Sequence, residues 1–411
     1  MDDTKVKAAL ESAKNLEADA VKSLVDLVRI PSENPPGECR AVGEAYAALL
    51  GELGYEVEVI PVPETMVRAE GLEGDRVNVI GRMRGSRPGR TLILNGHLDT
   101  VPAGDPDLWT DPPFAGVVSG GRVWGRGSSD SKGRMVAYAM SGVLLKSLGD
   151  FAGELIVTAT ADEEIGGRLG AGFLVERVGL RADAAIVEGY NESVVRAASG
   201  LLWLEITTRG LASHGSIPHR GKNAIGMATR AVAALEDLAT QLQSEPSGIP
   251  GIPHTTVNVG TISGGTKTNV VPDTCSVTVD FRVMPEADND DILRRVRSLL
   301  ADLAAKDPDF DADIRVIRNV PSHSCPPDAP IITSLQRASM AARGKRLEVM
   351  GEPGGTDARW FNPVGVNAVN YGPGHLEEGR FHGVDENMEI WRLTEAMAVL
   401  ALAASDFFDR D

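Results

Sequence analysis

The sequence predicts an α/β protein with a mixed, largely parallel sheet, into which a second domain of order βαββαβ is inserted. Three observations carry this prediction. Short β-rich runs alternate with helical patterns up to about Glu188, the order of elements changes after Ser199, and the α/β pattern resumes near the C-terminus. A chain of 411 residues is also too long for one ordinary core, so two domains are expected.

The first part of the chain alternates helices and strands. Helical periodicity covers Asp19–Ile30 and Cys39–Leu53, and the breaker NPPGE separates the two helices. Two further helices are expected at Lys132–Leu148 and Leu169–Val178. The strands expected in this part of the chain are YEVEVIPV, RVNVIGRM, TLILNGHL, GELIVTATAD and RADAAIVEG. This alternation is typical of a parallel sheet, in which functional groups gather where strands end.

The middle of the chain has a different order. Helices are expected at Asn223–Leu242 and Asp290–Ala305, and they are interleaved with the strands LLWLEITTRG, TTVNVGTIS, CSVTVDFRV and DADIRVIRNV. This is the order of a ferredoxin-like unit. Helix Ile331–Ala342, strand VNAVNYG and helix Ile390–Phe407 then complete the first domain. The predicted domains are therefore 1–198 with 321–411, and 199–320.

Charge and composition exclude several classes of protein. The formal net charge is −17 and no basic stripe occurs, which argues against nucleic acid as a partner. Neither a membrane-length apolar run nor a signal-peptide pattern is present, so we expect a cytoplasmic protein without membrane contact. The three cysteines, Cys39, Cys275 and Cys325, lack CxxC spacing, and we expect them to be small apolar fillers.

Residues with metal-ligand chemistry follow several of the expected strands. They are His97, Asp130, the pair Glu163 and Glu164, and Glu188, and His382 is added near the C-terminus. Two histidines and three carboxylates can hold two zinc ions with open positions for water, with one carboxylate bridging ions about 3.5–4 Å apart. Each residue alone is weak evidence, because Asp130 fits a helix N-cap and paired glutamates are usually solvated. The coincidence of all of them at strand ends predicts a site.

The types of residue also suggest their chemistry. Imidazole nitrogen and carboxylate oxygen suit zinc, cobalt or manganese. Asp99 lies two residues after His97 on the same face of a strand, so we expect its carboxylate to accept from the second ring nitrogen of His97. Of Glu163 and Glu164, one can bind metal while the other stays free as general base, because neighbouring side chains diverge.

The glycine-rich stretch GRGSSDSKGR also suggests a different class, a protein that binds magnesium and nucleotide. In that alternative Asp130 binds magnesium and Lys132 a phosphate. The stretch departs from GxxxxGK[ST], because Ser131 precedes Lys132 where glycine is needed and Gly133 follows where a hydroxyl is needed. The alternative is weaker but remains open at this point.

Seven stretches resemble one family over nearly the whole chain. They are NGHLDTVP, WTDPPFAGVVSGGRVWGRGSSDSKG, TADEEIGG, SHGSIPHRGKNAI, GTISGGTKTNVVPDTCSVTVDFRVMP, GGTDARWF and YGPGHLEEGRFHGVDEN. The chain resembles the two-zinc metallopeptidase and amidohydrolase family M20, in its acetylornithine deacetylase and succinyl-diaminopimelate desuccinylase branch. The resemblance implies a zinc-peptidase-like catalytic domain. It departs from the family at Ser131, where methionine is commoner, and at Gly189, where proline is commoner.

The resemblance also implies roles for individual residues. The metal ligands are His97, Asp130, Glu164, Glu188 and His382. By this resemblance, Asp130 is expected to bridge the ions, Asp99 to orient His97 and Glu163 to be the general base. His382 is preferred to His375 because the family has a histidine three residues before an Asp-Glu pair. Neither His375 nor His323 is given a role.

The remaining implications concern the inserted domain and the reaction. The family uses this domain as a lid and homodimer surface, and His214 resembles a histidine that reaches the partner's active site. Four residues resemble the group that holds a substrate carboxylate, namely Asn269, Arg282, Gly355 and Thr356. The expected activity is hydrolysis of the amide bond of a small N-acyl amino acid with two divalent ions, zinc first and cobalt or manganese as alternatives. A dipeptidase or carboxypeptidase is the alternative within the family.

Overall fold

The computed structural model describes residues 1–375 and 377–410 and divides into two compact units. The first contains Met1–Arg196, Cys325–Val349 and Thr356–Asp411, and the second contains Ala197–Ser324 and Met350–Gly355. The expected boundaries differ from these by two to four residues. The segment Met350–Gly355 was expected in the catalytic domain and is found in the second unit, where Gly351 N donates to Pro250 O at 2.7 Å.

The first unit is built on a mixed sheet. Its strands, in spatial order, are β1 (Glu56–Pro61), β2 (Val77–Arg84), β6 (Ala152–Thr160), β3 (Arg87–His97), β7 (Ala184–Val187), β15 (Asn367–Asn370) and β8 (Ser193–Ala198). The neighbours β6-β3-β7-β15 run parallel, while β1, β2 and β8 pair antiparallel. The predicted α/β fold with a largely parallel sheet is confirmed.

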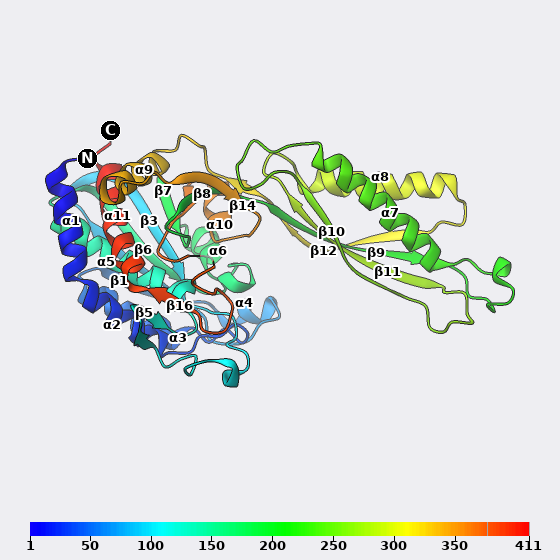
Figure 1. Cartoon of the computed structure of the whole chain (residues 1–411), viewed down its shortest axis with the longest axis horizontal. Coiled ribbons are helices and arrows are strands. Elements are labelled where there is room, and N and C mark those ends of the chain that lie inside the picture. Colours follow the sequence, from blue (N-terminus) through cyan, green and yellow to red (C-terminus); the bar gives the residue numbers. More distant parts are fainter. Residues whose placement is uncertain (376, 411) are drawn as a thin grey trace. The chain divides into compact units, whose positions relative to one another are not determined.

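Helices cover both faces of this sheet, as near-continuous apolar strands require. On β3, Leu92 and Leu94 belong to the larger core and Ile93 to the smaller one on the opposite face. The larger core is closed by α1 (Asp3–Asn15), α2 (Glu17–Val28), α3 (Arg40–Glu52), α5 (Gly133–Ser147), α9 (Pro330–Arg343) and α11 (Ile390–Phe408). The smaller core is closed by α6 (Ala171–Phe173) and α10 (Ala358–Phe361), on the other side of β3 in Figure 1.

The parallel strands end at one edge of the sheet, and this places the candidate residues. β3 ends on His97, β6 ends three residues before Glu163, and β7 ends immediately before Glu188. Short elements that the sequence did not predict complete the unit, namely α4 (Glu64–Ala69), β4 (Val117–Ser119), β5 (Arg122–Trp124) and β16 (Asn387–Glu389). Two more were not predicted: β13 (His323–Ser324) belongs to the second unit, and β14 (Glu348–Glu352) spans the border between the two units in the sequence.

The second unit has the predicted βαββαβ order. Its elements are β9 (Gly200–Arg209), α7 (Ala224–Gln243), β10 (Thr256–Gly264), β11 (Thr274–Val283), α8 (Asn289–Lys306) and β12 (Ala312–Val320). The strands form one antiparallel sheet of order β10-β11-β9-β12, and α7 and α8 pack on it through one apolar core. Figure 1 shows both helices on the same side of this sheet.

Within residues 1–375 and 377–410, no helix is long and apolar enough to cross a membrane.

Candidate metal centre

Asp130 lies between two histidines that are far apart in the sequence. Its Oδ1 is 3.2 Å from Nε2 of His97, and its Oδ2 is 3.2 Å from Nε2 of His382. The same nitrogen of His382 is also 3.2 Å from Oε2 of Glu164. Each oxygen of one carboxylate therefore faces a different imidazole, which is the arrangement that a bridging ligand requires.

Two carboxylate oxygens of this cluster are buried without a hydrogen-bond partner among the described residues. They are Oε1 of Glu164 and Oε2 of Glu188. Buried carboxylate oxygens ordinarily find a donor, so two orphans at one place favour a cation. Ligand atoms of His97, Asp130 and Glu164 also lie within 4.8 Å of one another. The donor set fits divalent ions such as zinc, cobalt or manganese.

Glu188 lies at the buried end of β7 and is held by its neighbours. Its Oε1 accepts from the backbone N–H of Asp357 at 3.2 Å, and its carbonyl accepts from Asn370 Nδ2 at 2.7 Å. Burial, and then the charge of Asp357, raise the pKa of Glu188 to about 8. The carboxylate of Asp357 is fixed in turn by Asn95 at 3.0 Å and Thr160 at 2.8 Å.

The contact expected between Asp99 and His97 is made differently. Nδ1 of His97 lies 2.9 Å from the main-chain oxygen of Asp99, and the carboxylate of Asp99 is 3.5 Å away. That carboxylate instead accepts from the backbone N–H groups of Glu163, at 3.2 Å, and Glu164, at 3.4 Å. Asp99 therefore positions both the His97 ring and the loop that carries Glu163 and Glu164.

Glu163 and Glu164 have different partners, although both lie in a short 3-10 turn (Glu163–Ile165) and not in the extended chain that the sequence predicted. Glu164 contacts His382, whereas Oε1 of Glu163 lies 3.6 Å from Nη2 of Arg359. Burial raises the pKa of Glu163 well above its ordinary value, and the charge of Glu188 acts in the same direction. A carboxylate with a raised pKa is a better proton acceptor near neutral pH.

The histidines and Asp130 stabilise one another's charged forms. Hydrogen bonds to Asp130 and Glu164 raise the pKa of His382 to about 10. Burial opposes ionisation of Asp130, but Arg134 and the two histidines together hold its pKa well below the ordinary range.

The glycine-rich loop before α5 is clamped by a carboxylate of the same chain. Glu386 accepts from the backbone N–H groups of Gly127, at 3.0 Å, Ser129, at 2.9 Å, and Asp130, at 2.9 Å. Lys132 is fully buried and donates to Ile30 O at 2.7 Å. The donors that a phosphate would need are thus already used, and the nucleotide alternative has no support.

The candidate residues of the second unit lie in two places, His214 and Asn269 just before the start of β11 and Arg282 at its end. Nδ1 of His214 is 2.7 Å from Ser216 Oγ, and His214 pairs with Val270, the residue after Asn269. Arg282 contacts Asp280 at 3.2 Å and Pro353 O at 3.3 Å, two residues before Gly355. Their proposed roles in substrate binding stay predictions.

Three other candidates have local contacts. The carbonyl of Thr356, in the first unit, accepts from Arg359 Nε at 2.8 Å. Nδ1 of His375 accepts from Glu378 N at 3.3 Å, and His323 is buried in β13. These contacts leave His375 and His323 without an assigned role.

Several residues around the centre were missed by sequence reasoning. They are Asn34, Arg134, Asp357, Arg359 and Glu386. Glu386 carried a signal, since it closes the HGVDE stretch that identified His382. Asp357 and Arg359 likewise lie in the stretch GGTDARWF, whereas Asn34 and Arg134 follow no strand end and no ligand spacing.

Comparison with known proteins shows the family of the chain. Residues 93–406 match the model of peptidase family M20/M25/M40. The chain is 34% identical to an acetylornithine deacetylase of Myxococcus xanthus over 81% of this chain and 84% of the relative. It is 27% identical to a succinyl-diaminopimelate desuccinylase of Cereibacter sphaeroides over 95% and 99% of the two chains.

Solved structures agree on the fold. Aminopeptidase PepT from Bacillus cereus superposes with a TM-score of 0.75 at 22% identity, over 96% of this chain and 99% of that one. A dinuclear metal-binding peptidase of the M20 family from Bacillus subtilis superposes with a TM-score of 0.67 at 18% identity, over 95% and 99%.

The family match and the relatives thus define a hydrolase of linear amide bonds, and the structure gives it a candidate metal centre. The chain belongs to peptidase family M20/M25/M40.

Proposed function

We propose that the protein is a two-metal deacylase that cleaves the amide bond of a small N-acyl amino acid. The observation that carries the proposal is the placement of Asp130 between His97 and His382, at 3.2 Å from each, beside the unpartnered oxygens of Glu164 and Glu188. These five residues are the proposed ligands. The ions are proposed to be zinc, with cobalt and manganese as alternatives.

The metals supply one part of the chemistry. Two divalent ions, when bound, polarise a scissile carbonyl and lower the pKa of water towards about 7. The chain supplies the proton transfers. Glu164 contacts His382, whereas Glu163 points elsewhere. The carboxylate of Glu163 can therefore take a proton from the attacking water and return it to the leaving amine.

The second unit is proposed to complete the site. His214 donates a hydrogen bond to the oxyanion, a role worth roughly 3–4 kcal/mol of barrier in other enzymes. Asn269, Arg282 and Gly355, together with Thr356 of the first unit, hold the substrate carboxylate, for which the planar guanidinium of Arg282 is suited. The names of the relatives, a deacetylase and a desuccinylase, support an acyl amino acid as substrate.

A hydrolysis screen tests the proposal. The chain loaded with zinc or cobalt is assayed on N-acetyl, N-succinyl and N-formyl amino acids and on dipeptides, with a chelator control. We expect cleavage of at least one acyl amino acid that the chelator abolishes. Cleavage of dipeptides alone would make the protein a peptidase instead, and chelator-resistant cleavage would overturn the metal mechanism.

Glu163→Gln is the matched variant for the general base. It keeps the size of the side chain but removes the proton acceptor, so kcat should fall at least about a hundredfold. Metal content measured by plasma emission should stay at the wild-type value. Retained turnover would remove Glu163 from its assigned role.

We also propose that the protein works in the cytoplasm as a homodimer formed through the second unit. Light scattering on the purified chain is expected to give twice the monomer mass. A monomer at micromolar concentration would overturn this part of the proposal.

A further inference from the structure

One buried arginine beside the metal centre has no part in the proposed reaction. Arg134, in the first turn of α5, donates from Nη1 to Oδ1 of Asp130 at 2.6 Å. The residue is 3% exposed, and its Nε has no hydrogen-bond partner among the described residues. A guanidinium keeps its positive charge at every pH that a protein survives.

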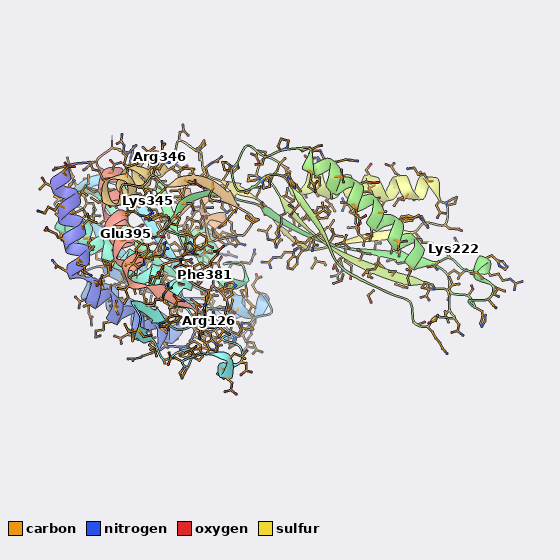
Figure 2. All side chains as sticks on the ribbon, viewed as in Figure 1. Arg126, Lys222, Lys345, Arg346, Phe381 and Glu395 are labelled. Atoms are coloured by element: carbon orange, nitrogen blue, oxygen red, sulfur yellow. The ribbon has the colours of Figure 1, made fainter. Side chains whose placement is uncertain are left out.

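The surroundings of Arg134 are shaped to hold it in place. Its guanidinium carbon lies 4.9 Å from the ring of Phe381, labelled in Figure 2, and 5.6 Å from the ring of Tyr190. Aromatic faces hold a cation at such distances.

The contact of Arg134 is not symmetric between the two halves of the centre. It donates to Oδ1 of Asp130, the oxygen that faces His97, while Oδ2 faces His382, whose Nε2 also contacts Glu164. An ion on the His97 side must share its carboxylate oxygen with a guanidinium. An ion on the His382 side would bind Oδ2 of Asp130, to which Arg134 does not donate. Like charges that contact the same carboxylate oxygen repel each other, and burial strengthens the repulsion.

We propose that Arg134 is a fixed positive charge of the metal centre that makes its two ion positions unequal and weakens the position beside His97. The proposal rests on the two-metal function proposed above. Arg134 acts through Asp130, so it is a positioning residue, and its effect is expected in metal binding first and in turnover second.

Calorimetric titration of the metal-free chain with Co²⁺ tests the proposal. The wild type should bind two ions in two separate phases. Arg134→Met removes the charge and keeps an apolar side chain between the rings, so the weaker phase should tighten at least about tenfold, the size of effect that outer-shell partners have on metal affinity. The tighter phase should change less than threefold. Arg134→Lys, which keeps a charge, should retain two unequal phases.

Two further variants show which of the two ion positions Arg134 affects. In the Arg134→Met background, His97→Ala should remove the tightened phase, whereas His382→Ala should remove the other one. Arg230→Met is the control. Arg230 stacks on Phe310 at 5.9 Å and pairs with Asp307 at 2.8 Å in the second unit, so neither Co²⁺ phase should change.

The outcomes separate this proposal from the function on which it rests. Unchanged phases in Arg134→Met, or equal tightening of both, overturn the role of Arg134. Binding of only one ion by the wild type and by Arg134→Met overturns the two-metal centre itself. Absorption of the Co²⁺ complexes and far-ultraviolet circular dichroism show in each case whether the variant is folded.

Discussion

Nδ2 of Asn34 donates to Oδ2 of Asp99 at 2.9 Å, across 65 residues of sequence. The same amide nitrogen lies 2.9 Å from Oδ1 of Asp162, so one donor joins two buried carboxylates. Asp162 is also paired with the buried Arg76 at 2.7 Å. Because the Asp99 carboxylate accepts from the backbone of Glu163 and Glu164, Asn34 is linked to the proposed base through a single residue.

Asn34→Ala should therefore lower kcat, by about 10- to 100-fold, the size of effect that outer-shell partners of metal ligands have. Loss of the donor frees the Asp99 carboxylate, and the loop that carries Glu163 is then less well fixed. KM should change little, because Asn34 is not proposed to touch substrate. Steady-state kinetics on the best substrate of the screen measures both constants.

Asn289→Ala is the control for this prediction. Asn289 is a buried amide of the second unit whose Nδ2 donates to Asn319 Oδ1 at 2.7 Å and to Val320 O at 2.9 Å. Its loss should lower the melting temperature without changing kcat. Equal kcat losses in the two variants would show that Asn34 acts through stability alone.

Glu386→Ala should destabilise the metal-free chain by about 3–5 kcal/mol, as expected when one partner of a buried ion pair is removed. The change leaves Arg126, 2.6 Å from Glu386 in the native chain, without its carboxylate. It also leaves the N–H groups of Gly127, Ser129 and Asp130 without their acceptor. Urea unfolding of the metal-free protein measures the loss.

Glu378→Ala is the surface comparison for that measurement. Glu378 pairs with Arg122 at 3.4 Å and its side chain is 49% exposed, so its loss should cost less than about 1 kcal/mol. Similar losses in the two variants would mean that Glu386 does not hold the loop.

The ligand candidates could be predicted because they follow strands of a parallel sheet. His97, Glu163, Glu164 and Glu188 come directly after apolar runs, and the ends of such runs meet at one edge. Residues that support them carry no such signal. Asn34 lies in a proline-rich breaker, and Arg134 lies in the first turn of a helix whose sequence does not set it apart.

The domain border shows a similar limit. The change from α/β to βαββαβ order located the second unit to within a few residues, because periodicity changes there. Met350–Gly355 joins that unit through backbone hydrogen bonds such as Ser199 N to Glu352 O at 3.1 Å. Backbone contacts of this kind leave no trace in the pattern of side chains.

His214→Ala should lose activity, and mixing it with Glu163→Ala chains should restore part of it. If His214 serves the partner's site, a mixed dimer has one site with both an intact Glu163 and the partner's histidine. The two inactive variants are unfolded together, refolded and assayed against each variant refolded alone. Absence of recovery in proven mixed dimers would place His214 in its own subunit's site.

Asp406 should make the stability of the first unit depend on pH. It joins α11 to α9 through Ser334 Oγ at 2.8 Å and pairs with Arg410 at 2.8 Å. Burial alone would raise its pKa, but the contacts with Arg410 and Ser334 lower it below the ordinary value. A lowered folded pKa means that the stabilisation is complete above the unfolded pKa of about 4 and is lost as the pH falls through the folded pKa.

Asp406→Asn should therefore lower the free energy of unfolding by about 1 kcal/mol at pH 7, and the difference from wild type should shrink below pH of about 4. Urea unfolding of wild type and Asp406→Asn, from pH 7 to below pH of about 4, measures the difference in free energy of unfolding. A difference that stays constant over this range would show that the charge of Asp406 contributes nothing.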